Sequence, residues 1–185
     1  MEKTIYLQKI GQVDPIILKQ LKKTLKWTFK KYFDTINILK NPLPLLESYY
    51  NSSRKQYKAS SILIQLIDSI KNKNEYSTLG ILDKDLYSKT YSFVFGVALE
   101  FNRVALISTT RLKESFYGRA ENISLFELRI AKEAIHELGH TFGLKHCHKE
   151  CVMQFSNSLA KVDMKPAKFC QTCSEKLKDL LENLA

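Results

Sequence analysis

The sequence predicts an α/β fold with a twisted, mostly parallel sheet, one antiparallel edge strand and helices packed against the sheet. Segments typical of strands alternate with amphipathic helical segments over residues 4–108, which is the pattern of parallel strands joined by crossover helices. The last two strand segments are separated only by residues 101–103, a link that suits a hairpin and therefore an antiparallel pair. The second half adds one long helix and an irregular C-terminal part.

Each element in the first half follows from a local pattern. Asp14 and Pro15 begin the first helix, because Asp caps free amides and Pro suits the first turn. Apolar residues then recur every four positions at Ile17, Leu21 and Leu25, with lysines on the other faces. In chain order we expect a strand over 4–10, a helix over 15–31, a strand over 35–39, a loop over 41–58, a helix over 60–71, and strands over 78–82, 92–100 and 104–108.

A long helix is expected between the last strand and Gly143. Ser124 followed by Glu127 is a capping-box pattern for its start, and apolar residues repeat with helical spacing behind it. Gly143 should end the helix, because glycine tolerates the left-handed backbone that closes many helices. Beyond it the sequence has little pattern until a short amphipathic helix over 175–184.

Composition places the chain among folded proteins. Hydrophobic residues make up 44% of the 185 residues, which is enough for a core and too many for a disordered chain. No apolar run approaches the ~20 residues of a membrane-spanning helix, and the first ten residues lack the layout of a secretory signal. The net charge of +10 is compatible with nucleic acid or an anionic membrane, but the lysines are spread along the chain. We therefore expect a cytoplasmic, monomeric protein with a solvated lysine-rich surface, and neither nucleic acid nor membrane as a partner.

The run HELGHTFGLKH, which begins at His136, holds three of the four histidines. A spacing of four places His136 and His140 on one helix face, and the turn at Gly143 lets His146 swing back as a third ligand of the same ion. Three neutral imidazoles with one open position are the catalytic rather than the structural arrangement of zinc. Glu137 can take a proton from metal-bound water and return it to a leaving amine. Two unrelated histidines are the alternative for the bare motif, but the Gly and His at fixed offsets make coincidence very rare.

All four cysteines follow this run, at Cys147, Cys151, Cys170 and Cys173. In a cytosolic chain such cysteines are expected to bind a metal rather than form disulfides, and these spacings are typical of zinc. Four thiolates leave no open position, so the site would be structural and would staple residues 152–169 onto the end of the long helix. Two disulfides or free thiols are the alternative interpretations.

These residues resemble the metzincin zinc proteases and, with the cysteines and CVM at 151–153, the archaemetzincins in particular. Four further stretches resemble that family, namely RKQY at 54–57, LGILDKDLY at 79–87, FVFG at 93–96 and VALISTTRL at 104–112. The resemblance implies a metzincin-like sheet with a backing helix, an active-site helix and a small, irregular, zinc-stapled C-terminal lobe. It implies one catalytic domain over 1–185, with an upper subdomain over 1–143 and a C-terminal subdomain over 144–185.

The resemblance also implies roles for single residues. His136, His140 and His146 would bind catalytic zinc, with Glu137 as general base. Met153 would be the Met-turn residue that packs below these ligands. The four cysteines would bind a second, structural zinc, namely Cys147, Cys151, Cys170 and Cys173. The edge strand near residues 93–101 would form the upper rim of the cleft, along which a peptide lies as an extra strand.

The predicted function is therefore that of a zinc-dependent peptidase with two zinc ions per chain. It would hydrolyse peptide bonds through metal-activated water, and the family analogy adds aminopeptidase-like activity on small peptides. The alternative is a non-catalytic zinc-binding module that interacts with peptides. Glu137 counts against that alternative, since a site that only binds has no need of a base beside the metal.

Overall fold

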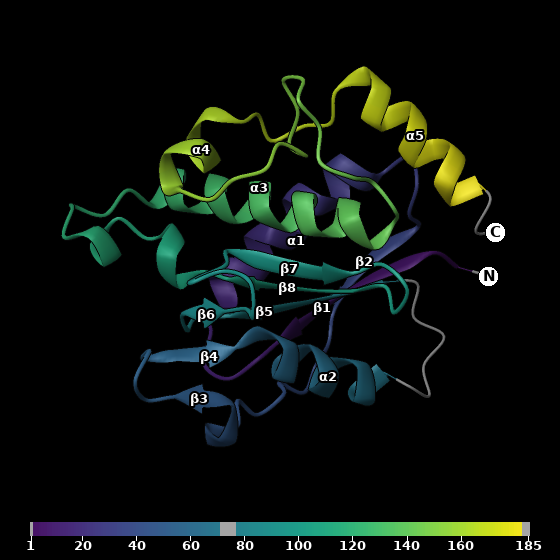
Figure 1. Cartoon of the computed structure of the whole chain (residues 1–185). Coiled ribbons are helices and arrows are strands. Elements are labelled where there is room, and N and C mark those ends of the chain that lie inside the picture. Colours follow the sequence, from purple (N-terminus) through teal and green to yellow (C-terminus); the bar gives the residue numbers. More distant parts are fainter. Residues whose placement is uncertain (1, 71–76, 183–185) are drawn as a thin grey trace.

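The computed structural model describes residues 2–70 and 77–182, and its centre is a five-stranded sheet with the strand order β2-β1-β5-β8-β7. The strands are β1 (Thr4–Lys9), β2 (Thr35–Ile38), β5 (Ser77–Leu82), β7 (Gly96–Leu99) and β8 (Val104–Ser108). Four of them run parallel, and β7 runs antiparallel to β8 at one edge (Figure 1). The prediction of a mostly parallel sheet with one antiparallel edge strand is confirmed.

Helices cover both faces of this sheet (Figure 1). The three main helices are α1 (Pro15–Phe29), α2 (Ala59–Ile70) and α3 (Ile123–Thr141). Alternate residues of β8 supply two cores, because Ala105 and Ile107 pack with α1 and α3, whereas Val104 and Leu106 pack with α2. A strand that is buried on both faces reads as a continuous apolar run, which explains the sequence of β8.

Two strands of a second, three-stranded sheet lie where the sequence predicted a loop over residues 41–58. The sheet consists of β3 (Tyr50–Asn51), β4 (Gln56–Lys58) and β6 (Leu86–Tyr87), in the order β3-β4-β6. A single 3₁₀ turn, η1 (Glu47–Tyr49), precedes it. The loop prediction was wrong here because strands of two or three residues are too short to show an alternating pattern.

The edge strand is shorter than predicted. The sequence indicated a strand over residues 92–100, but only Gly96–Leu99 pair with β8. Before that point the Val94 N–H donates to the Leu86 carbonyl of β6 at 3.0 Å, and the Phe95 carbonyl accepts from the Ser108 N–H at 2.8 Å. The segment therefore changes partner from β6 to β8 within two residues, which interrupts the strand.

The start of α3 corrects the predicted cap. Asn122, not Ser124, precedes the first turn, and its side-chain oxygen accepts from the Leu125 N–H at 3.0 Å. Asn and Ser are both good caps, and the sequence carries both within three positions, so the pattern alone favoured the wrong one. At the other end Gly143 has a φ of 97°, as predicted for the residue that closes the helix.

The C-terminal part is more regular than predicted. A short helix, α4 (Leu159–Met164), was missed, and α5 (Gln171–Glu182) begins four residues before the predicted helix. Residue 184 of that prediction and residue 71 at the end of the second predicted helix lie outside the described residues. Within residues 2–70 and 77–182, no helix combines the length and the apolar character that crossing a bilayer would need.

The cap assignment makes a prediction about stability. Asn122→Ala should lower the free energy of unfolding by about 1 kcal/mol, because the Leu125 N–H loses its partner. The matched variant Ser124→Ala should stay within about 0.5 kcal/mol of wild type, as expected for an exposed residue without a capping role. Urea unfolding of the zinc-loaded proteins measures both, and a larger loss for Ser124→Ala would restore the capping box.

Candidate metal centre

The last turns of α3 bring His136, Glu137 and His140 to one side of the helix. The chain then turns at Gly143, whose N–H donates to the His140 carbonyl at 3.0 Å. This turn carries His146 back toward the other two imidazoles, so that one ring nitrogen from each histidine lies within 4.8 Å of the others. The structure therefore brings together the three histidines that the sequence singled out.

Backbone carbonyls fix which ring nitrogen faces the centre. His136 Nδ1 lies 2.9 Å from the Val152 carbonyl, and His140 Nδ1 lies 2.7 Å from the Leu144 carbonyl. Because a carbonyl oxygen can only accept, both Nδ1 atoms carry the proton, and the Nε2 atoms present lone pairs. These backbone contacts are the kind that orient metal-binding imidazoles in proteins.

The distance between the two Nε2 atoms, from His136 to His140, is 3.1 Å. Two lone pairs that face each other at this distance repel unless a cation lies between them. Nitrogens that each lie ~2.0–2.1 Å from one tetrahedral zinc are separated by roughly 3.3 Å, so this donor set fits zinc.

Burial keeps these imidazoles neutral. Burial, with a smaller contribution from the nearby Lys165 cation, lowers the pKa of His136 to about 2. The pKa of His140 is also lowered, chiefly by burial, and partial desolvation lowers the pKa of the more exposed His146. Only a neutral imidazole can donate a lone pair to a metal, so the site does not need to lose protons before it binds one.

Glu137 lies against the edge strand. A methyl group placed on Gly96 of β7 would come within 2.6 Å of Glu137 Cγ, so only glycine allows this approach. Burial raises the pKa of the Glu137 carboxyl well above its usual value, and the neighbouring Glu133 raises it further, while Lys165 acts in the opposite direction. A carboxyl with a raised pKa is a better proton acceptor near neutral pH.

Met153 packs under the helix that carries these residues. Its side chain is fully buried, and a Cβ placed on Gly139 would lie only 2.5 Å from its sulfur. Gly139 is therefore required by the closeness of Met153, in addition to any role in the motif. The Met153 carbonyl also accepts from the Cys147 N–H at 3.0 Å, which ties this segment to the residue after His146.

A cleft of about 380 Å³ opens in front of the histidines. One wall is the edge strand, the floor is α3, and the opposite wall is the segment over residues 155–157. In an antiparallel pair the backbone groups of alternate residues face the partner strand, so the N–H and C=O groups of Gly96 and Ala98 point away from β8 and toward this cleft. The predicted upper rim is thus present, although it is shorter.

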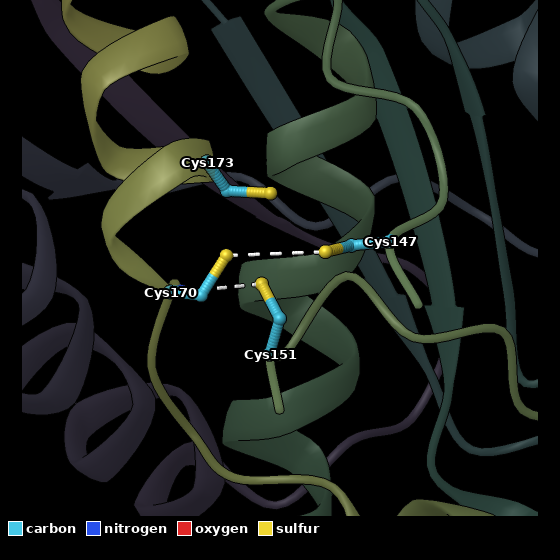
Figure 2. Close-up of side chains that lie close together, drawn as sticks. All are labelled: Cys147, Cys151, Cys170 and Cys173. Atoms are coloured by element: carbon cyan, nitrogen blue, oxygen red, sulfur yellow. Dashed lines mark hydrogen bonds between the residues drawn. The ribbon is translucent and has the colours of Figure 1, made fainter. Parts of the chain in front are cut away.

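The four cysteines form a second cluster. Cys147 and Cys151 come from the segment after α3, and Cys170 and Cys173 come from the start of α5 (Figure 2). Their sulfurs all lie within 4.8 Å of one another, and none is in a disulfide. The sulfurs of Cys147 and Cys170 are 3.9 Å apart, close to the roughly 3.8 Å expected for two thiolates on one tetrahedral zinc.

Backbone amides surround the cysteine cluster as well. The Cys170 N–H donates to the Cys151 sulfur at 3.2 Å, and the Lys149 N–H donates to the Cys147 sulfur at 3.4 Å. Hydrogen bonds to the ligand atoms orient side chains for metal binding. The set of four sulfurs therefore fits a closed zinc site, without an open position for a substrate.

The sequence profile of peptidase family M54 matches residues 15–179. The chain belongs to this family. It is therefore a zinc metallopeptidase, which confirms the resemblance to the archaemetzincins.

Named relatives agree with this assignment. The chain is 41% identical to the archaemetzincin of Methanocaldococcus jannaschii over 177 residues, which cover 95% of this chain and 93% of the relative. It is 35% identical to the archaemetzincin of Pyrococcus furiosus over 183 residues, which cover 98% and 95%.

Solved structures of two archaemetzincins and of a zinc-dependent peptidase share the fold. The archaemetzincin of Archaeoglobus fulgidus, crystallised with malonate, is 36% identical with a TM-score of 0.78, and the match covers 94% of this chain and 99% of that one. The archaemetzincin of Methanopyrus kandleri is 34% identical with a TM-score of 0.80, covering 98% and 96%. A zinc-dependent peptidase of Methanocorpusculum labreanum is 27% identical with a TM-score of 0.83, covering 94% and 99%.

Two features of the cleft were missed from the sequence. Glu133 lines the cleft one helical turn before Glu137, and the spacing of four between them was the available signal. Tyr91 and Phe155 reach toward each other across the cleft with ring centroids 6.1 Å apart. No local pattern marks two aromatic residues this far apart in sequence as neighbours.

The contact between Gly139 and Met153 predicts that replacing this helical glycine with alanine destabilises the protein, the opposite of the usual effect. Ala is ordinarily better than Gly within a helix by about 1 kcal/mol, yet Gly139→Ala should destabilise this protein by about 1–3 kcal/mol, because the new methyl group overlaps the Met153 sulfur. In a Met153→Ala background the same substitution should become neutral or stabilising. Urea unfolding of the four zinc-loaded proteins measures this cycle, and additive effects would show that Met153 is not the constraint.

Proposed function

We propose that His136, His140 and His146 hold the catalytic zinc and that Glu137 is the general base of peptide-bond hydrolysis. The observation that carries this proposal is the position of Glu137, a buried carboxyl that approaches Gly96 of the edge strand β7 and lines the same cleft as the three imidazoles. Zinc bound by these three histidines would act as a Lewis acid that polarises the scissile carbonyl and lowers the pKa of water. Glu137 then takes the proton of the attacking water and passes it to the leaving amine.

The edge strand positions the peptide for this reaction. A peptide in extended conformation can pair with the N–H and C=O groups of Gly96 and Ala98, which the β8 strand leaves unused. Such pairing recognises main chain and holds the scissile bond over Glu137. This role also explains why β7 approaches the Glu137 side chain so closely that only glycine fits at position 96.

The dimensions of the cleft support small peptides and chain ends as substrates. Its volume of about 380 Å³ is near the lower end for ligand sites. The Tyr91 and Phe155 rings narrow it, and the Phe155 ring also lies 5.1 Å from the His146 ring. These contacts support the aminopeptidase-like activity that the family resemblance implies, since a folded segment would not fit between the rings.

We further propose that Cys147, Cys151, Cys170 and Cys173 bind a second, structural zinc. This ion would join α5 to the segment that follows α3, and it would make residues 144–185 a small subdomain on one side of the cleft. Residues 1–143 would form the upper subdomain on the other side. Because Cys147 follows His146 directly, the structural ion would also hold the third imidazole in place.

Glu137→Gln tests the role of the base. The amide keeps the shape of the side chain but cannot accept a proton, so kcat for peptide hydrolysis should fall by about 10²–10⁴-fold. Zinc content should stay at the wild-type value, since Glu137 is not among the ligands. Peptide cleavage is followed by mass spectrometry on a peptide library, with zinc measured on the same samples by elemental mass spectrometry. Cleavage at the wild-type rate would remove Glu137 from the mechanism.

Zinc stoichiometry tests the two sites separately. Wild-type protein purified without added metal should contain two zinc ions per chain. His140→Ala should retain one and remain folded, whereas the double variant Cys170→Ser, Cys173→Ser should lose the structural ion and show a clearly lower Tm, because metal binding at such sites contributes to folding free energy. Disulfides and no zinc in the wild-type protein would contradict both sites.

A further inference from the structure

A buried ion pair lies at the floor of the cleft and takes no part in the proposed reaction. Glu133 lines the cleft on α3, one turn before Glu137, and its side chain is only 4% exposed. Its Oε1 atom lies 2.8 Å from Nζ of Lys165, whose side chain is completely buried. Glu133 therefore borders the cleft beside Glu137, and Lys165 lies behind it in the interior.

Neighbouring contacts hold Lys165 in position. It follows α4, and the end of that helix is fastened to α3 by charged groups. The Arg129 guanidinium donates to both carboxylate oxygens of Asp163, at 2.6 and 2.7 Å. The Lys132 ammonium donates to the Val162 and Asp163 carbonyls, at 3.0 and 2.8 Å. These bonds make the Glu133–Lys165 pair a fixed feature of the cleft rather than a mobile surface contact.

Burying two charged groups costs free energy, so the pair is a poor choice if its only role is to stabilise the fold. Glu133 Oε1 and Lys165 Nζ have no further hydrogen-bond partner among residues 2–70 and 77–182. A buried ion pair with unsatisfied groups is commonly no more stable than an apolar pair of the same shape. The other carboxylate oxygen of Glu133, Oε2, accepts no hydrogen bond in the described part of the chain and is not among its fully buried unpaired atoms, and Glu133 lines the cleft.

We propose that Glu133 is a substrate-recognition residue, whose free oxygen accepts a hydrogen bond from the peptide side chain that follows the scissile bond. This inference rests on the proposed peptidase function. The direction of the peptide decides which of its residues lies beside Glu133. α3 and β7 run side by side in the same direction (Figure 1). A peptide that pairs with β7 is more stable when it runs antiparallel to the strand. The residues after the scissile bond then extend from Glu137 toward Glu133.

The chemistry of the pair defines the preferred side chain. Lys165 balances the charge of Glu133, so a neutral donor such as the Gln amide is sufficient to satisfy Oε2. The isosteric Glu side chain brings a second carboxylate against the first, and like charges at close range are strongly disfavoured. The cleft should therefore accept hydrogen-bond donors and exclude acidic residues at this position.

The test uses peptides that differ only by Gln or Glu after the cleaved bond, and three zinc-loaded proteins. Wild type should cleave the Gln peptide with a kcat/KM at least about tenfold higher than the Glu peptide. Glu133→Gln leaves Lys165 without its counterion, so the preference should reverse toward Glu. The double variant Glu133→Gln, Lys165→Met removes both charges, keeps a similar volume, and should show no preference within about threefold. The zinc is common to all three proteins, so its own attraction for the acidic peptide cancels in the comparison.

Each result separates this inference from the proposed function. Cleavage of both peptides with the same ratio in all three proteins would overturn the role of Glu133 and leave the peptidase mechanism intact. If wild type cleaves neither peptide, the mechanism fails, and the affinities of the same peptides for the zinc-loaded proteins, measured by calorimetry, decide the inference. The same three preferences should then appear in Kd, and equal affinities would overturn the inference. Should Glu133→Gln alone fail to fold, the double variant still provides the uncharged comparison.

Discussion

The arrangement depends on one constraint: three neutral imidazoles and a carboxyl must meet at one place, and a single helix must deliver most of them. α3 does this only because its neighbours come very close. Met153 touches Gly139 from below, and Gly96 of the edge strand touches Glu137 from above. The sheet and α1 bury the rear of the helix, so that its front cannot rotate. Carbonyls of the chain beyond the helix then set the imidazole planes.

The site was easier to predict from the sequence than the parts around it. The three histidines and four cysteines combine scarce residue types with metal-binding spacings, so a local motif was sufficient, and the pattern over residues 104–108 indicated a strand. Predictions failed where contacts between residues distant in sequence determine the local structure. Asn122 competes with Ser124 for one cap, and the Glu133–Lys165 contact joins residues that no local pattern connects. α4 was missed because six residues carry too little periodicity.

Charged groups, in addition to apolar packing, hold α4 and the segment before α3 against α3. Arg129 is nearly inaccessible, and besides Asp163 it pairs with Glu114, while also donating to the Leu112 carbonyl. Arg129 and Lys132 are two cations on the buried side of α3. Their hydrogen-bond acceptors lie at the end of α4 and in the segment before α3. Directional bonds of this kind specify one placement of α4 against α3, whereas an apolar contact would tolerate sliding.

The unpaired edge of β7 affects whether strands of other proteins can add to this sheet. An unpaired strand edge is normally a template for aggregation, because any other edge can add to it. Here the accessible stretch is only Gly96–Leu99, β6 already occupies the backbone at Val94, and the opposite wall carries Phe155. The proposed substrate, a single extended chain, needs less room in this recess than a folded sheet would. The same geometry would thus admit an unfolded peptide and disfavour the addition of a folded sheet to this edge.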